Sequence, residues 1–191
     1  MLKDSNASLL ISNEELFDKI LKFNREKVKI EYFNKIVNNY KSTHISLEDK
    51  KILKESKPEV NDNYILLYTS GTTGKPKVFY LSQKNIVNIS TYYKNNRHLN
   101  PNDNIAAYSS FGFDASMIDM YPALISGGTV HIIPEDMKLD LLKLNDYFNQ
   151  NNITIAFMTT QLGRQFVDTM NNHPIRVFNV GGETLAPIEP S

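Results

Sequence analysis

The sequence predicts an α/β fold in which a mostly parallel sheet is flanked by helices. Short apolar runs alternate with longer amphipathic segments along the 191 residues, and this alternation is typical of βαβ units. The spacing between successive runs leaves room for helical crossovers, which parallel strands require. A composition of 41% apolar and 22% charged residues is ordinary for a globular protein. The alternation therefore predicts one continuous α/β layer structure.

The first part of the chain predicts a strand, a helix and a second strand before a polar stretch. An apolar run at 8–12 is followed by an Asn-Glu-Glu helix start and an amphipathic segment that ends near residue 21. A second strand is predicted at 28–31. Residues 41–63 are polar and contain Pro58, so we expect a surface segment there with one short helix near 47–53.

The rest of the chain predicts a hairpin followed by alternating helices and strands. Apolar runs at 65–68 and 78–81 are close enough to pair across the turn-rich segment between them. Ser82 is placed to cap a helix that ends near residue 95. Beyond this helix, strands are predicted at 105–108, 129–133, 154–158 and 176–180, and helices at 115–125, 139–151 and 161–170.

The composition disfavours several classes of function. The 21 Lys and Arg residues balance 21 Asp and Glu residues, so no net charge attracts nucleic acid or an anionic membrane. The sequence has no cysteine for disulfides or zinc–thiolate sites, and its four histidines show no metal-ligand spacing. No apolar run approaches the ~18 residues that span a bilayer. We therefore expect a cytoplasmic protein with no nucleic-acid or membrane partner and no metal ligands in the chain.

The segment most indicative of chemistry lies between the two hairpin strands. Residues 69–77 read Thr-Ser-Gly-Thr-Thr-Gly-Lys-Pro-Lys. Glycines let backbone N–H groups approach an anion, hydroxyls donate hydrogen bonds to phosphate oxygens, and lysines add positive charge. The P-loop pattern fails, because Gly71 precedes Gly74 by only three positions and Pro76 follows Lys75. The residues predict a polyphosphate site of another kind, with a polar hairpin turn as the alternative.

The run from Tyr68 to Lys77 resembles the signature Y-T-S-G-[ST]-T-G-x-P-K-G of the adenylate-forming superfamily, although Val78 stands where that family usually has glycine. This superfamily includes acyl-CoA synthetases and the amino-acid-activating domains of nonribosomal peptide synthetases. The resemblance implies that ATP binds here. It also implies which residues hold the β- and γ-phosphates, namely Thr69, Ser70, Gly71, Thr72, Thr73, Gly74, Lys75 and Lys77.

Two further segments match the same family in the same order. Phe113-Asp114-Ala115-Ser116 matches the F-D-x-S motif of peptide-synthetase adenylation domains, in which the Asp binds the α-ammonium group of an amino acid. By residue type alone, Asp114 would be a helix N-cap. The third segment, Gly181-Gly182-Glu183-Thr184-Leu185, resembles G-G-E-x-L and follows a strand, where parallel sheets bind ligands. It implies an adenine side formed by Gly182, Glu183 and Thr184.

The resemblance also implies which positions line the pocket for the substrate side chain. They are Ala115, Ile118, Phe157, Asn179 and Gly181. For Ile118 and Phe157 a plain core position is an equal alternative, and Asn179 could hydrogen-bond a polar neutral side chain. Because these residues include no charged side chain besides the nearby Asp114, the expected substrate is a small neutral amino acid.

The resemblance covers almost the whole chain and implies that residues 1–191 are a partial adenylation (AMP-binding) domain, truncated at both ends. It would be one subdomain-sized piece of the large N-terminal domain. The segments N-x-Y-G-P-T-E, with its Mg2+-binding Glu, and Y-x-T-G-D, with its ribose-binding Asp, are expected beyond the chain end, as is the catalytic Lys. The complete enzyme would form an aminoacyl-AMP and pass it to the phosphopantetheine thiol of a peptidyl carrier domain. We expect the isolated chain to be inactive.

Three alternatives remain at this point. A D-alanine–carrier-protein ligase would suit residues 117–122, followed by 126–129, and an acyl-CoA synthetase relative would share the phosphate loop. A non-catalytic nucleotide-binding or interaction module is the third, for which Val78 is the local hint. Asp119, Glu135 and Asp136 are interpreted as helix-surface and turn residues.

Overall fold

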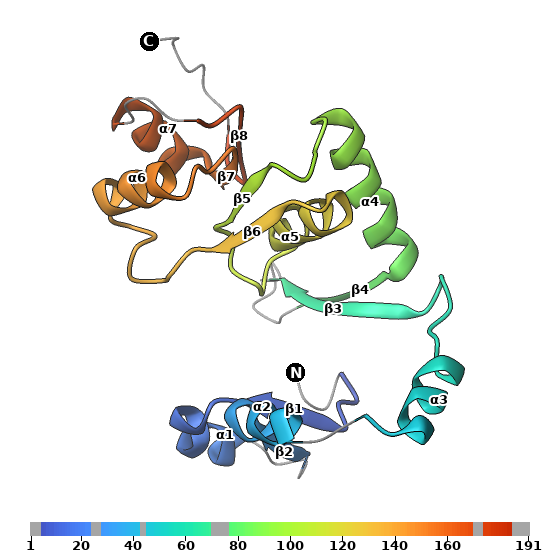
Figure 1. The fold of residues 1–191 in the computed structure, drawn as a ribbon. Helices are drawn as coiled ribbons and strands as arrows, with labels where there is room; N and C mark the ends of the chain where they lie inside the picture. The colour runs from blue at the N-terminus through green and yellow to red at the C-terminus, as the bar shows by residue number, and fades with distance from the viewer. Residues whose placement is uncertain (1–4, 24–27, 43–44, 70–76, 170–173, 185–191) are drawn as a thin grey trace. The chain divides into compact units, whose positions relative to one another are not determined.

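A computed structural model describes residues 5–23, 28–42, 45–69, 77–169 and 174–184 (Figure 1). The chain divides into two compact units, Met1–Pro58 and Glu59–Ser191. The larger unit has a parallel four-stranded sheet flanked by helices, which confirms the predicted α/β class. Among the described helices, none is long and apolar enough to cross a membrane.

The first unit is built on two short parallel strands. β1 (Leu9–Ser12) and β2 (Lys29–Tyr32) are joined by a 3-10 turn, η1 (Glu14–Leu16), and by α1 (Phe17–Phe23). The parallel pairing places Leu9 opposite Lys29. These elements lie where the apolar runs and the Asn-Glu-Glu helix start predicted them.

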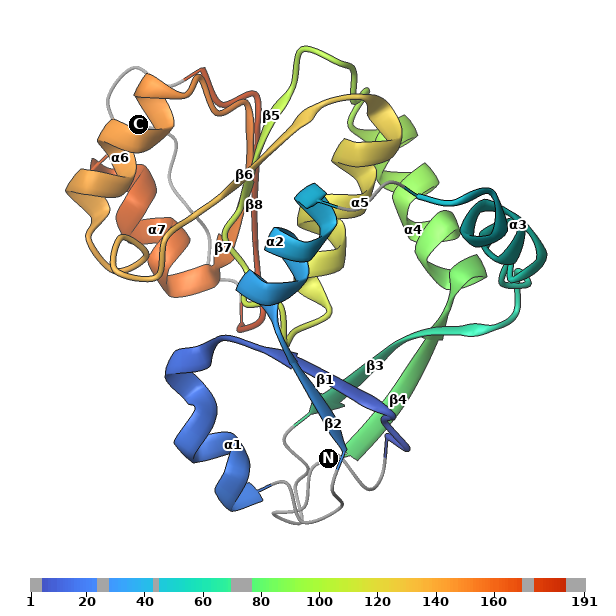
Figure 2. The same ribbon diagram turned by 60° about the horizontal axis from the view of Figure 1, so that its bottom comes forward.

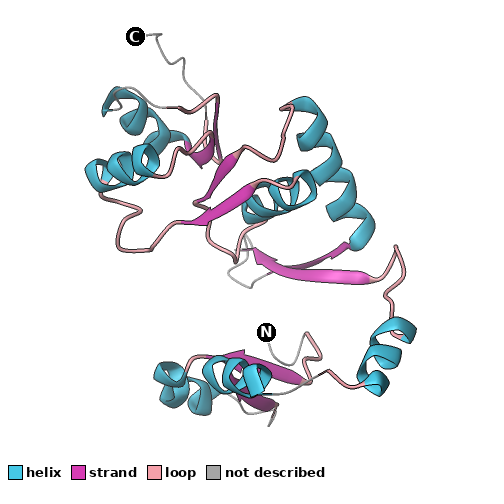
Figure 3. Cartoon of the chain, in the orientation of Figure 1, coloured by secondary structure: helices cyan, strands magenta, loops and turns pink. Residues whose placement is uncertain are grey.

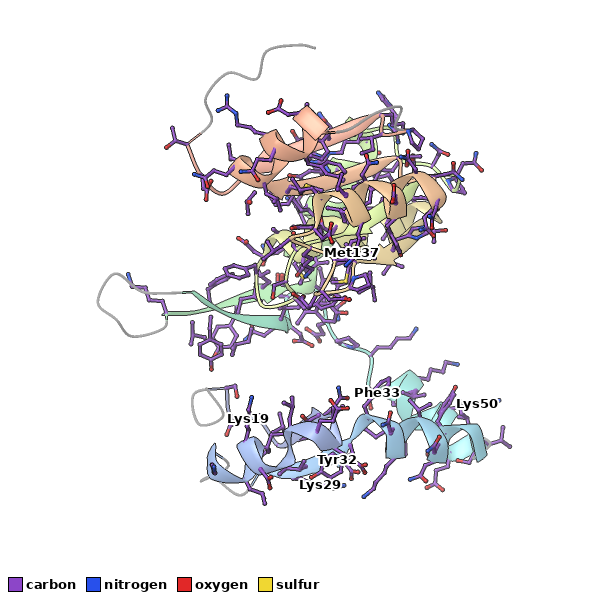
Figure 4. The ribbon with its side chains drawn as sticks, turned by 90° about the vertical axis from the view of Figure 1, so that its left-hand side faces the viewer. Lys19, Lys29, Tyr32, Phe33, Lys50 and Met137 are labelled. Carbon is purple, nitrogen blue, oxygen red and sulfur yellow. The ribbon has the colours of Figure 1, made fainter. Side chains whose placement is uncertain are left out.

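A helix that was not predicted follows β2 directly. In α2 (Phe33–Ser42), Phe33, Ile36, Val37 and Tyr40 recur at the i, i+3, i+4, i+7 spacing of an amphipathic helix. The start of α2 is marked by Tyr32 and Phe33 in Figure 4. The apolar spacing in the sequence therefore did indicate this helix, although the asparagines and β-branched residues of α2 lower its helix propensity.

The predicted short helix in the polar stretch is α3 (Leu47–Glu55). It begins with a capping box, because Ser46 Oγ accepts a hydrogen bond from the amide of Asp49 at 3.0 Å while the Asp49 carboxylate accepts one from the amide of Ser46 at 3.0 Å. These bonds satisfy backbone groups that the helix itself leaves unpaired.

The second unit begins with the predicted hairpin. β3 (Asn63–Thr69) and β4 (Lys77–Ser82) are antiparallel and form a long two-stranded ribbon (Figure 3). Ser82 then caps α4 (Gln83–Asn96), since its hydroxyl accepts a hydrogen bond from the amide of Asn85 at 3.3 Å. Both the hairpin and the cap were predicted.

The main sheet has the strand order β6-β5-β7-β8, and every pairing is parallel (Figure 2). Figure 1 shows α4 and α5 on one side of the sheet and α6 and α7 on the other. The strands are β5 (Asn104–Ala107), β6 (Thr129–Ile132), β7 (Ile155–Thr159) and β8 (Val177–Gly181), and the helices are α5 (Ala115–Ser126), α6 (Leu141–Gln150) and α7 (Thr160–Thr169).

Alternate residues of the central strands point to opposite faces of this sheet. On β5, Ile105 belongs to the core cluster that includes Ala123 of α5, whereas Ala106 belongs to the cluster of α6 and α7. The second cluster is centred on Phe148 and Phe166, whose rings lie 5.2 Å apart. Met137, on the connection from β6 to α6, packs against this cluster (Figure 4). Apolar residues on both faces explain why the strands read as short apolar runs.

Two glycines shape the ends and contacts of the helices. Gly127 ends α5 in the left-handed conformation at φ 75°, which glycine adopts without the steric cost of a Cβ. Gly163 lies inside α7, where a Cβ atom would collide with Val180 Cγ1 of β8. The missing side chain therefore lets α7 approach the strand that carries Gly181.

Candidate active site

Five of the predicted site residues, Asp114, Ala115, Phe157, Gly181 and Gly182, line a cavity of about 440 Å³ at the carboxyl ends of the parallel strands. Ligands of open parallel sheets bind at this edge, because the loops that follow the strands meet there. Each strand of the main sheet contributes, either by its last residues or by the loop after it. The lining residues are Tyr108, Ser109, Ser110, Phe113, Asp114, Ala115, Glu135, Lys138, Phe157, Thr159, Gly181 and Gly182.

Asp114 directly precedes α5, at its N-cap position, but its side chain does not cap the helix. Its backbone is helical, with φ −61° and ψ −30°, and its side chain accepts no capping hydrogen bond. An N-cap needs an extended backbone to fold its carboxylate back onto the helix amides. No hydrogen bond or ion pair between described residues involves this carboxylate. The simple N-cap interpretation is therefore wrong, and the carboxylate is free to accept hydrogen bonds from a cationic group in the cavity.

The predicted side-chain pocket is brought together only in part. Ala115, Phe157 and Gly181 line the cavity with Asp114. A Cβ atom at Gly181 would lie 3.3 Å from Phe157 Cε2, so the missing side chain makes room for the ring. Ile118 instead lines a second cavity of about 360 Å³ between α4 and α5, to which Asp114 and Ala115 also contribute.

Of Asn179 and the three residues predicted for the adenine side, only Gly182 lines the main cavity. The amide of Asn179 donates a hydrogen bond to the carbonyl of Ala156 at 3.4 Å, and Asn179 is not among the residues that line either of these cavities. Gly182, in the left-handed region at φ 92°, lines the main cavity. Glu183 lines a neighbouring cavity that shares Tyr108 and Thr159 with the main one, and Thr184 is exposed.

The phosphate loop can be followed only at its two ends. Six of its predicted residues lie outside the described residues, namely Ser70, Gly71, Thr72, Thr73, Gly74 and Lys75. Thr69, the last residue of β3, pairs with Lys77, the first residue of β4. The hairpin thus holds the ends of the loop at adjacent positions, and the Lys77 side chain is exposed.

The cavity also contains a charged pair that the sequence analysis missed. Lys138 Nζ lies 2.5 Å from Glu135 Oε1, and Tyr108 donates a hydrogen bond from its hydroxyl to the carbonyl of Lys138 at 2.6 Å. Burial raises the pKa of Tyr108 to about 12. The cavity wall is therefore less apolar than the predicted positions indicated. The position of Glu135 just after β6 was the available signal, since that edge of the sheet holds the site.

Asp119 is a second residue that sequence reasoning misplaced. It was interpreted as a helix-surface residue, but it is 3% exposed, and its Oδ2 accepts a hydrogen bond from the amide of Ser109 at 3.0 Å. Burial raises the pKa of Asp119 to about 6, although the Ser109 hydrogen bonds and the charge of Arg97 oppose this shift. The burial of Asp119 could have been inferred from helical spacing, because it lies on the same side of α5 as the buried residues Ser116, Ala123 and Ser126.

Among the described residues, no group of three or more His, Cys, Asp or Glu side chains could hold a metal ion. Two acidic residues, Asp114 and Glu135, are among those that line the cavity, and Glu135 is paired with Lys138. The donor set in the described part of the cavity therefore does not form an Mg2+ site.

Comparison with known proteins identifies the family. The sequence model of the family described as AMP-binding enzyme matches residues 1–188, and the chain belongs to that family. It is 40% identical over 120 residues, or 63% of its length, to surfactin synthase subunit 2 of Bacillus subtilis strain 168. It is also 31% identical over 155 residues, or 81% of its length, to gramicidin S synthase 1 of Brevibacillus brevis. The chain spans 3% and 13% of these relatives, respectively.

Solved structures share the fold. A crystal structure of a four-domain nonribosomal peptide synthetase bound to AMP and glycine matches with a TM-score of 0.75 and 22% identity, over 96% of this chain and 13% of that one. The Vibrio cholerae adenylation domain AlmE, in complex with glycyl-adenosine-5'-phosphate, matches with a TM-score of 0.57 and 20% identity, over 84% of this chain and 28% of that one. The family match and the two synthase relatives confirm the resemblance to peptide-synthetase adenylation domains, and these structures show that the fold is shared.

Proposed function

We propose that these residues are the central part of an amino-acid adenylation domain that supplies a carrier protein in nonribosomal peptide synthesis. The single observation that carries the proposal is the Asp114 carboxylate, which lines the cavity at the strand ends and makes no capping bond. Asp114 is exposed in the cavity, and its carboxylate can pair with the α-ammonium of an amino acid through charge-assisted hydrogen bonds.

In the proposed reaction, an oxygen of the substrate carboxylate attacks the α-phosphorus of ATP. The bond from that phosphorus to the bridging oxygen breaks, so that aminoacyl-AMP forms and pyrophosphate leaves. Asp114 would hold the amino group, and Gly182 would let the backbone lie close to the adenylate. The hydroxyls, glycines and lysines of 69–77 would stabilise charge on the β- and γ-phosphates. Mg2+, where bound, would neutralise phosphate charge through a Glu outside these residues.

A small neutral amino acid is the substrate class that we propose. The ring of Phe157 lies against Gly181, and both residues line the cavity together with Asp114, so the ring takes up part of the space open to a substrate side chain. Glu135 and Lys138 form an ion pair in the wall, so together they add no net charge that would favour a charged side chain. The two solved relatives described above hold glycine and a glycyl adenylate, which supports this size class.

A second candidate is a D-alanine–carrier-protein ligase, because the same geometry serves any small amino acid. An acyl-CoA synthetase is less well supported, since a fatty acid has no ammonium group for Asp114. In either amino-acid case, the adenylate would pass to the phosphopantetheine thiol of a carrier. The 191 residues contain no cysteine, so they offer no thiol of their own to accept the aminoacyl group.

The test is amino-acid-dependent exchange of pyrophosphate into ATP. It should be measured with the parent protein, by which we mean these residues together with the sequence that continues them, and with the 191-residue chain alone. We expect exchange by the parent with glycine or with L- or D-alanine, and none by the chain alone. A parent protein that exchanges with no amino acid would overturn the proposal, and preference for D-alanine would favour the second candidate. Steady exchange by the chain alone would show that no further segment is needed.

A further inference from the structure

Asp119 is a buried carboxylate that the proposed reaction does not use directly. It lies on α5 and is 3% exposed, and its Oδ2 accepts the amide hydrogen of Ser109, which follows β5, at 3.0 Å. Burial of a carboxylate is costly unless it forms hydrogen bonds. Packing alone therefore does not explain why a carboxylate occupies this buried position.

The hydrogen bond joins α5 to the start of the loop that precedes it. Ser109 and Ser110 line the cavity and lead through Phe113 to Asp114. The other end of this loop is also fixed, because the Ser116 hydroxyl donates a hydrogen bond to the carbonyl of Phe113 at 2.7 Å. In between, the amide of Phe113 donates to the carbonyl of Ser110 at 2.9 Å. The loop is thus held to one helix at both of its ends.

This double attachment matters because no hydrogen bond or ion pair within the described part of the chain fixes the carboxylate of Asp114. Its side chain forms no capping bond, so its direction is set by the backbone on which it stands. That backbone is the end of the loop that Asp119 and Ser116 hold. A displacement of about 1 Å at such a group can cost about a hundredfold in rate.

We propose that Asp119 is a positioning residue, which holds the Ser109–Asp114 loop so that the Asp114 carboxylate faces the amino group of the substrate. This inference rests on the proposed function. It assigns to Asp119 an effect on amino-acid binding that passes through Asp114, and no effect on the binding of ATP.

The experiment measures exchange kinetics of the parent protein with Asp119→Ala and Asp119→Asn. We expect Asp119→Ala to raise KM for the amino acid about tenfold or more while KM for ATP stays within about twofold. Asn keeps an acceptor oxygen, so Asp119→Asn should restore the amino-acid KM to within about threefold of the wild type. Asp119→Leu, which fills the site without an acceptor, serves where the Ala variant does not fold, with the same expected rise.

A matched control and a double variant separate positioning from general damage. Asp103 is equally buried, at 3% exposure, but lies before β5, at the opposite end of the strand from Ser109. Asp103→Asn should leave the amino-acid KM within about twofold. In an Asp114→Ala background, Asp119→Ala should raise this KM by less than about twofold, because the group through which it acts is gone.

The outcomes distinguish the inference from the proposed function. An active wild type whose amino-acid KM is unchanged by Asp119→Ala, or changed as much by Asp103→Asn, would overturn the positioning role. A full tenfold effect of Asp119→Ala in the Asp114→Ala background would do the same, because the residue would then act independently. A wild type that shows no exchange with any amino acid would instead overturn the proposed function, and the inference with it.

Discussion

Arg176 binds Asp103 through two parallel hydrogen bonds, from Nη2 to Oδ2 at 2.6 Å and from Nε to Oδ1 at 2.9 Å. Asp103 also accepts hydrogen bonds from the amide of Asn100 at 3.0 Å and from the hydroxyl of Thr154 at 2.8 Å. These residues precede β5, β7 and β8. The pair therefore joins the amino ends of three strands, at the edge of the sheet opposite the candidate active site.

The first prediction is that Asp103→Asn lowers the free energy of unfolding of the chain by about 2 kcal/mol, because the buried carboxylate would lose its charge-assisted hydrogen bonds to Arg176, whose own side chain is 35% exposed. Urea unfolding at pH 7 measures this. The exposed pair of Lys143 and Asp140, with 3.2 Å between Nζ and Oδ2, provides the control, and Lys143→Gln should cost less than about 1 kcal/mol. Equal losses in the two variants would show that Asp103 has no special role.

The same pair sets part of the acid stability. Burial alone would raise the pKa of Asp103, but the hydrogen bonds from Arg176, Asn100 and Thr154 outweigh it, and the pKa lies below 3.8. The unfolded chain therefore binds this proton more tightly than the folded one. The contribution is present above pH 3.8 and is lost as the pH falls through the lower pKa of the folded state.

The second prediction concerns the contact of α7 with β8. Gly163→Ala should lower the free energy of unfolding by about 1–3 kcal/mol, because its Cβ would collide with Val180 Cγ1 and lie 3.3 Å from Phe178 Cε1. Alanine is otherwise the better helix former, so a loss identifies the collision. Gly112, where the nearest neighbour of a Cβ atom would be Ser110 Oγ at 3.9 Å, is the control, and Gly112→Ala should change the free energy of unfolding by less than about 0.5 kcal/mol. A stabilised Gly163→Ala variant would contradict the close approach.

The order of strands and helices in the second unit could be predicted, because both faces of the parallel sheet are covered. Buried strands such as Ile155–Thr159 read as apolar runs, and Ser82 and Gly127 mark helix ends by local chemistry. The division of the chain at Pro58 was not predicted. Only a polar stretch marks it in the sequence.

Site residues that fall on a sequence motif could be predicted. Residues whose role depends on tertiary contacts were missed. Asp114 and Gly182 fall on motifs, and both line the cavity. The roles of Lys138 and Asp119 depend on partners that local sequence does not specify, since Lys138 pairs with Glu135 at the cavity and Asp119 reaches back ten residues to Ser109. A charged residue on a helix is usually exposed, so its burial had to come from the fold.

The third prediction is a stability profile set by Asp119, whose pKa is raised to about 6 by burial. Between pH 3.8 and about 6 the folded chain binds this proton and the unfolded chain does not. The free energy of unfolding should therefore fall as the pH rises through this range, by up to about 3 kcal/mol. In Asp119→Asn this fall should be absent, whereas it should persist in Asp103→Asn. Urea titrations at pH 4, 5, 6 and 7 measure it, and an unchanged slope in Asp119→Asn would assign the fall to another group.

The fourth prediction compares two aspartates that stand at helix starts. Asp140 caps α6, since its Oδ1 accepts the amide hydrogen of Lys143 at 3.1 Å, whereas Asp114 caps nothing. Asp140→Ala should therefore lower the free energy of unfolding by about 1 kcal/mol, and Asp114→Ala should change it by less than about 0.5 kcal/mol.

In the parent protein the order of effects should reverse. Asp114→Ala should raise KM for the amino acid at least about tenfold, because the substrate ammonium would lose its charged partner, while Asp140→Ala should leave it unchanged. Unfolding and pyrophosphate-exchange measurements on the same two variants decide the matter. An Asp114→Ala variant that is as destabilised as Asp140→Ala, but binds the amino acid normally, would return Asp114 to the role of a helix cap.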